Sequence, residues 1–106
     1  MPSKLRRFEI LLPLQFNDGS KVPRGLLTDA TLELVAQFGA LTYETQTVEG
    51  QWTNEGVVYR DQLVKFVIDI QDDEVNRKWM RDFKRRWRTK LQQIDLWVVS
   101  YKIEAE

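Results

Sequence analysis

The chain has 106 residues, 42% of them hydrophobic and 30% charged, which suits one packed domain and leaves no material for a second core. Sixteen basic residues balance sixteen acidic ones, so no overall charge draws the molecule to nucleic acid or anionic lipid. Cysteine and histidine are absent, which excludes disulfides, thiolate nucleophiles and the commonest general base. The first apolar stretch is short and broken by Glu9 and Pro13, which predicts a soluble cytoplasmic protein without membrane partners.

The first predicted element is a strand over residues 5–15. Phe8, Ile10 and Leu12 recur at period two, which is the pattern of a strand with one buried face. Polar and glycine residues at 17–20 end this strand. A first helix is predicted over residues 24–38, since its apolar residues recur at helical spacing and Gly39 follows as a C-cap.

The second half of the chain predicts two more strands, a helix and a last strand. Residues 40–48 alternate in polarity, which predicts a strand at a sheet edge, and residues 49–56 are expected to form a turn. Residues 57–70 predict a central third strand because its end is almost continuously apolar. The acids Asp72, Asp73 and Glu74 open the longest helix, and residues 94–103 form the last strand.

This order of elements predicts the fold class. One α+β domain over residues 1–106 is expected, a ferredoxin-like βαββαβ sandwich with a four-stranded antiparallel sheet and both helices on one face. Enzymes, ligand sensors, nucleic-acid binders and dimerisation modules all use this fold, so the function has to be argued from individual sites.

Four short segments are distinctive: Phe16 with Val22-Pro23, Gly50-Gln51-Trp52, Tyr59-Arg60-Asp61 and Leu91-Gln92-Gln93. In these segments, which together span most of its length, the chain resembles a family of small uncharacterised bacterial proteins. The resemblance supports the same fold. It implies no activity, cofactor or catalytic residue.

The sequence offers little for catalysis. No serine lies in a nucleophile-elbow motif, and only carboxylate chemistry remains. Asp69, Asp72 and Asp73 lie near the start of the second helix and could together hold Mg²⁺. The alternative, which we favour, is that these acids accept hydrogen bonds from the unpaired amides of the first helical turn and interact favourably with the helix dipole. We therefore predict a protein that is not an enzyme and has no metal and no cofactor.

The loop before the first helix is a candidate ligand site. It contains glycine, backbone amides and two cations that could cradle an anion. The residues concerned are Asp18, Gly19, Lys21 and Arg24. The segment from Pro23 to Gly39 is similar to the glycine-leucine start of the first helix in ACT domains, which implies an amino-acid sensor with its ligand held at this loop between paired copies. The alternative is a simple turn before a helix.

The second helix carries a basic stripe. Residues 72–92 include eight basic and four acidic residues, a net charge of +4. The cations proposed to contact polyanions are Arg77, Arg81, Lys84, Arg85 and Arg88. Such a stripe predicts weak, sequence-independent binding to nucleic acid through phosphate contacts. The alternative is a solvated helix face whose charges pair along the helix.

The side of the sheet without helices predicts self-association. Leu11, Leu63 and Val67 lie opposite the core side, and the last strand adds Leu96 and Val98, because it is apolar on both faces. A large exposed apolar patch is rare on a monomer, so we expect a homodimer through this patch, with another protein as the alternative partner. Trp79, Trp87 and Trp97 are expected in the core. Together these features predict a non-enzymatic interaction or regulatory module.

Overall fold

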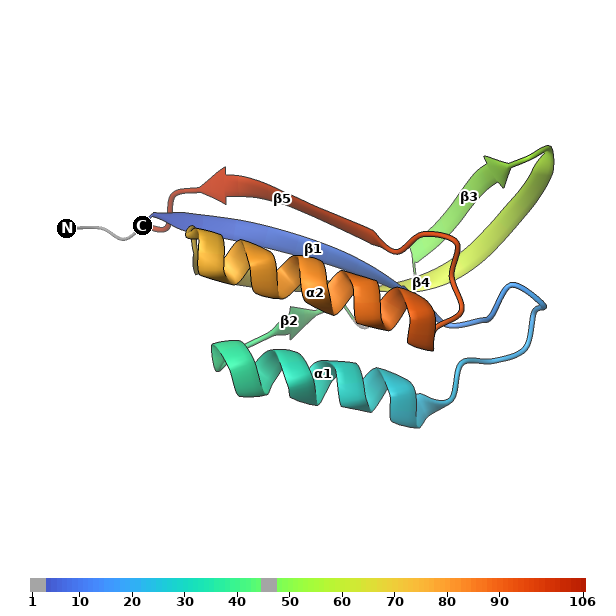
Figure 1. The fold of residues 1–106 in the computed structure, drawn as a ribbon, viewed down its shortest axis with the longest axis horizontal. Coiled ribbons are helices and arrows are strands. Elements are labelled where there is room, and N and C mark those ends of the chain that lie inside the picture. Colours follow the sequence, from blue (N-terminus) through green and yellow to red (C-terminus); the bar gives the residue numbers. More distant parts are fainter. Residues whose placement is uncertain (1–3, 45–47) are drawn as a thin grey trace.

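A computed structural model describes residues 4–44 and 48–106 of the chain. Its elements, shown in Figure 1, are β1 (Leu5–Pro13), α1 (Arg24–Phe38), β2 (Thr42–Tyr43), β3 (Val48–Asn54), β4 (Val57–Gln71), α2 (Glu74–Lys90) and β5 (Trp97–Ile103). The α+β class is confirmed. In this part of the chain, no helix is long and apolar enough to cross a membrane.

The five strands form one antiparallel sheet in the order β2-β4-β1-β5, with β3 paired to the first half of β4. The expected sheet had four strands, and β3 corrects that expectation because it is a fifth strand. Residues 49–56, expected as a turn, mostly belong to β3, and the turn itself needs only Glu55 and Gly56. Both have positive φ angles, 50° and 78°, the geometry of a two-residue hairpin turn.

Both helices cover the same face of the sheet, and the β3–β4 hairpin bends away from them (Figure 1). The predicted core positions of β1 and β4 are confirmed, since Phe8, Ile10, Leu12, Phe66, Ile68 and Ile70 are all buried. They pack with residues of both helices, among them Ala30, Leu34, Met80, Phe83 and Trp87. We call the side of the sheet without helices the open face.

The register of β5 corrects several assignments. Leu11 lies opposite Trp97 and Ile10 opposite Val98, so the odd-numbered residues of β5 share the open face with Leu11. Trp97 is therefore 58% exposed and is no core residue, contrary to expectation. Leu96 is buried and Val98 packs against the core, so neither is exposed as part of the predicted apolar patch.

Candidate functional site

The open face is hollowed where the β3–β4 hairpin leaves the sheet. The hollow has a volume of about 410 Å³. Its lining comes from β1, β3, β4, β5 and the segment before β5: Leu11, Pro13, Gly50, Gln51, Trp52, Leu63, Gln93, Asp95, Leu96 and Trp97. Mostly apolar concave sites of this size, with a few polar groups, are typical of small-molecule binding.

Backbone geometry keeps the hollow open. In β1 and β4 the odd-numbered residues point to the open face. Leu11 and Pro13 therefore project from the end of β1, and Leu63 projects from β4 beside them. A Cβ atom at Gly50 would lie 3.2 Å from Leu63 Cδ1, which is tighter than ordinary contact. Glycine at this position therefore preserves space that any other residue would reduce.

Two tryptophans give the hollow aromatic walls. Trp52 stacks on Tyr59, with ring centroids 4.4 Å apart and ring planes 16° from parallel, so the hairpin holds its indole in a fixed orientation. Trp97 comes from the first position of β5 and is more than half exposed. Such indole faces stack on flat heteroaromatic rings and attract cations.

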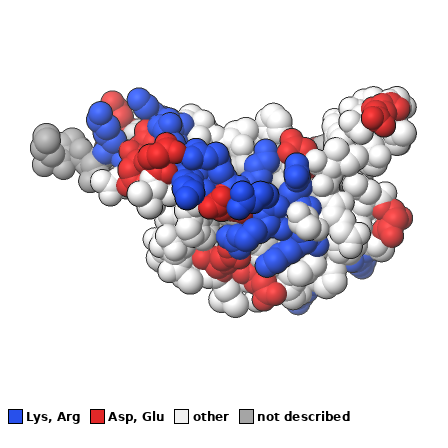
Figure 2. All heavy atoms as spheres, viewed as in Figure 1, with Lys and Arg blue, Asp and Glu red and all other residues white. Residues whose placement is uncertain are grey.

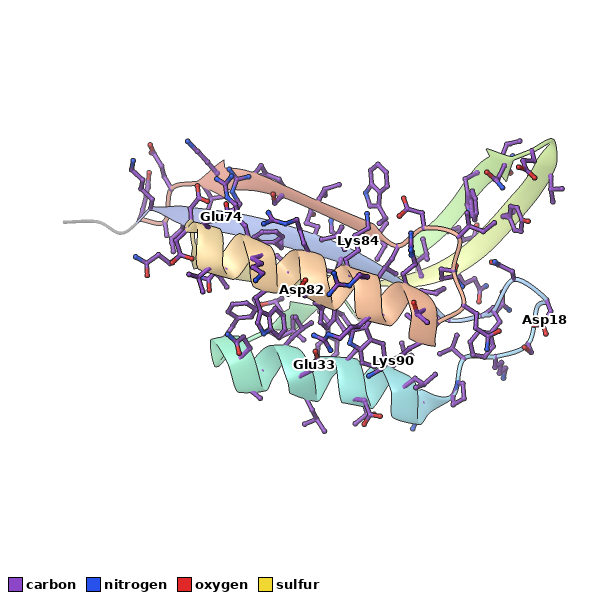
Figure 3. The ribbon with its side chains drawn as sticks, in the orientation of Figure 1. Asp18, Glu33, Glu74, Asp82, Lys84 and Lys90 are labelled. Carbon is purple, nitrogen blue, oxygen red and sulfur yellow. The ribbon has the colours of Figure 1, made fainter. Side chains whose placement is uncertain are left out.

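Besides Gln51 of β3, the polar side chains of the hollow come from the segment between α2 and β5. Leu91 and Leu96 are both buried and anchor the two ends of this segment. Gln93 Nε2 donates to the backbone carbonyl of Leu91 at 2.9 Å. Asp95 Oδ1 accepts from the amide of Leu96 at 2.9 Å and from Lys84 Nζ at 3.2 Å; Lys84 is labelled on α2 in Figure 3. Asp95 thus gives the hollow an oriented carboxylate.

The loop predicted to hold a ligand bonds largely within itself. Asp18, at the far tip of the loop in Figure 3, accepts from the backbone amide of Ser20 at 2.9 Å. Hydrogen bonds from the side chain and backbone of Ser20 lower the pKa of Asp18. The backbone amides of Gly19 and Val22 donate to the backbone carbonyls of Phe16 and Leu14. The backbone of Lys21 pairs with that of Gln15 in an isolated antiparallel β-bridge. Arg24 lies apart, as the first residue of α1.

The predicted basic stripe is present on α2, and Figure 2 shows the basic side chains gathered along that helix. Four of its five cations lie in ion pairs: Arg77 with Asp72 at 2.7 Å, Arg81 with Glu74 at 2.6 Å, Lys84 with Asp95 at 3.2 Å and Arg85 with Asp82 at 3.1 Å. Arg88 lies in the last turn of α2. The stripe is therefore partly compensated by carboxylates.

The three aspartates weighed as a metal site point to different partners. Asp69 pairs with Arg7 on the open face, Asp72 with Arg6 and Arg77, and Asp73 accepts from the amide of Asn76 as the N-cap of α2. Among the residues whose side chains the structure describes, no group of three possible metal ligands comes together.

Comparison with known proteins gives a likeness in structure only. No protein-family model matches the chain. No curated protein matches it either. A solved structure of a phage SAM lyase in complex with S-methyl-5′-thioadenosine has a TM-score of 0.67 and 12% identity, and the match covers 100% of this chain and 93% of that one. A phage SAM lyase in the apo state has a TM-score of 0.59 and 13% identity, with 98% and 90% covered. At these identities, the likeness concerns the fold.

This finding corrects the prediction that the chain is not an enzyme. Two solved structures of phage SAM lyases share this fold over 98–100% of the chain, so the fold is one that enzymes also use. The absence of histidine and cysteine excludes particular mechanisms and does not exclude catalysis as such.

The sequence did not point to the hollow as a site. Leu11 and Leu63 were assigned to a dimer surface, and Trp97 to the core. Asp95 belongs to no motif, and Gln93 belongs only to a segment whose resemblance implied no site. Both residues meet the tryptophans because β3 extends the sheet and β5 has its particular register. The one available signal was the small residue Gly50, two positions before Trp52 in a segment that is otherwise polar.

Proposed function

We propose that the chain binds S-adenosylmethionine in the hollow of the open face and cleaves it as a lyase. The observation that carries the proposal is an apolar hollow of about 410 Å³ with two tryptophans and a carboxylate, on a fold that matches phage SAM lyases over the whole chain. One of those lyases holds S-methyl-5′-thioadenosine, which has the size and the flat ring that such a hollow accommodates.

Each part of the ligand has a matching group in the proposal. The adenine ring stacks on Trp97, the exposed indole at the rim. The ribose hydroxyls donate to the carboxylate of Asp95, which the Leu96 amide and Lys84 hold in place. The sulfonium lies near the indole of Trp52, whose face attracts a cation.

The proposed reaction needs no histidine or cysteine. A carboxylate oxygen of the methionyl group attacks the γ-carbon of the same group, and the bond from this carbon to sulfur breaks. The bonding electron pair stays on sulfur, so the products are S-methyl-5′-thioadenosine and homoserine lactone, and no proton is transferred. The chain then contributes by holding the carboxylate in line with the carbon–sulfur bond and by excluding water with its apolar walls.

The strand order supports a ferredoxin-like description of the same fold. Without β3, the sheet reads β2-β4-β1-β5 with both helices on one face, which is the order that two split βαβ units produce. We propose that β3 is an extension of this four-stranded arrangement that creates one wall of the hollow.

The test is product formation from S-adenosylmethionine. Chromatography of the incubated protein should show S-methyl-5′-thioadenosine and homoserine lactone in equal amounts. Trp97→Ala should weaken S-methyl-5′-thioadenosine binding, measured by calorimetry, by roughly 5- to 150-fold, because stacking on a base is worth about 1–3 kcal/mol. Val75→Ala, at an exposed apolar residue of α2, is the matched control and should leave both measurements unchanged. The proposal is refuted if the wild type does not cleave S-adenosylmethionine and does not bind S-methyl-5′-thioadenosine.

A second candidate is weak polyanion binding through α2, favoured by the gathering of basic side chains in Figure 2. Exposed ion pairs are worth little, so phosphates can replace the carboxylates that now pair with Arg81 and Lys84. Replacing Arg81, Lys84 and Arg88 together by Gln should abolish retention on heparin at low salt, since each lost phosphate contact lowers the affinity and the salt dependence. Wild-type protein that passes through heparin at about 50 mM salt would exclude this candidate.

A further inference from the structure

The outer edge of β5 is an unpaired sheet edge. Among the described strands, β5 ends the sheet and pairs only with β1. The backbone N–H and C=O groups on its other side point away from the sheet, and such an edge pairs readily with another strand. Its seven residues are long enough for a stable antiparallel pairing.

A basic groove runs beside this edge, between β5 and α2. It has a volume of about 360 Å³ and an apolar floor of Phe8, Met80 and Val98. Arg77, Arg81 and Lys84 line it from α2, and Ser100 lines it from β5. The helix runs antiparallel to the strand, because Arg6 joins Asp72 to Ser100 near the start of α2, while Lys84 reaches Asp95 just before β5. A strand added at the edge would therefore place alternate side chains over these cations.

The chain itself contains two carboxylates that can complement the Lys84 end of the groove, and they follow the cation Lys102. Glu104 and Glu106 follow β5, are exposed, and have the parity of Val98 and Ser100, whose side chains line the groove. Suppose that β5 of a second copy pairs antiparallel to β5 with Tyr101 at the twofold axis. Position 104 of that copy then lies opposite Val98 beside Lys84, and position 106 lies opposite Leu96, toward Arg88 one turn further along α2.

We propose that two copies of the chain pair through β5, with Glu104 and Glu106 of each copy bound to Lys84 and Arg88 of the other. The pairing joins two five-stranded sheets into one continuous sheet across a twofold axis. Lys84 now shares an exposed ion pair with Asp95, with 37% and 60% of the two side chains exposed, so it can accept a second carboxylate at little cost.

This arrangement leaves the open face free. A dimer through the open face would cover Leu11 and Leu63, which line the hollow, and would close it to a ligand. Pairing at the edge of β5 adds strands beside the sheet instead. The edge dimer is therefore compatible with a ligand in the hollow, although it does not depend on the proposed reaction.

Light scattering behind a sizing column tests the proposal at micromolar concentration. The wild type should have twice the chain mass of 12.6 kDa. Two double variants, Glu104→Lys with Glu106→Lys, and Lys84→Glu with Arg88→Glu, should each be monomeric because like charges then face each other. Mixing the two variants should restore the dimer, since each half of the mixed interface again joins opposite charges. Circular dichroism checks that both variants are folded.

Val67→Glu is the matched control, because Val67 lies on the open face and not at the edge of β5. It should leave the dimer mass unchanged. The proposal is overturned by a monomeric wild type, by a mixture that stays monomeric, or by a dimer that Val67→Glu dissociates and the charge reversals do not.

Discussion

Asp72 joins the start of α2 to β1 with one carboxylate. Its Oδ1 accepts from Arg6 Nε at 3.1 Å and from Arg77 Nε and Nη2 at 2.9 and 2.7 Å, and only 5% of the side chain is exposed. Hydrogen bonds from Arg77 and Arg6 lower the pKa of Asp72 against the opposing effect of desolvation. The carboxylate is thus stabilised in its ionised form by the fold.

This shift predicts a pH dependence of stability. Because the folded pKa lies below the unfolded value of about 3.9, the stabilisation is present above about pH 4 and is lost as the pH falls through the folded pKa. Asp72→Asn should lower the urea midpoint at pH 7 and should reduce the further loss between pH 7 and pH 3. Asp18, Glu33 and Glu74 also have lowered pKa values, so part of the acid sensitivity should persist. Wild-type and variant midpoints that fall in parallel would contradict this role.

The tryptophans show which residues could be placed from the sequence. Trp87 was correctly expected in the core, because a helical repeat fixes which side of a helix faces inward. Its indole nitrogen also donates to Glu33 Oε2 at 3.0 Å, a contact across 54 residues that no local pattern encodes. Trp97 could not be placed, because β5 is apolar on both faces and only its register with β1 decides which side is inward.

At the scale of elements, long periodic segments were predicted well and short polar ones were not. The range expected for the first helix coincides with α1, and Gly39 is its C-cap with a φ of 84°. By contrast, β3 alternates glycine, tryptophan and asparagine with glutamate, glutamine and threonine, so neither of its faces reads as buried. The wall that β3 gives to the hollow was therefore missed with it.

The start of α2 allows a direct test of a local signal. Asp73 has extended backbone angles and accepts from the amide of Asn76 at 2.7 Å, so it satisfies one of the unpaired amides of the first turn. Asp73→Ala should lower the free energy of unfolding by about 1 kcal/mol, measured by urea denaturation. Asp73→Asn is the matched control and should retain most of the stability, because asparagine caps helices about as well. Equal losses in both variants would show that the cap bond is not the cause.

At the scale of the molecule, the sheet separates the core from the candidate chemistry. The helix-covered face carries the buried residues, while the open face carries the ion pairs Arg7–Asp69 and Lys65–Glu9 beside the hollow. The hollow itself takes residues from four strands and from the segment before β5. These residues come together only in the folded chain, so a ligand of the hollow binds the folded state and not the unfolded one.

Ligand binding should therefore raise the melting temperature by mass action. At a ligand concentration 100 times Kd, S-methyl-5′-thioadenosine should stabilise the fold by about 2.7 kcal/mol. For a domain of this size, the melting temperature should then rise by roughly 10–20 °C in differential scanning fluorimetry. Trp97→Ala should need a higher ligand concentration for the same rise, because a wall of the hollow is lost, whereas Val75→Ala should follow the wild type. A melting temperature that is independent of ligand concentration would show that this chain does not bind S-methyl-5′-thioadenosine.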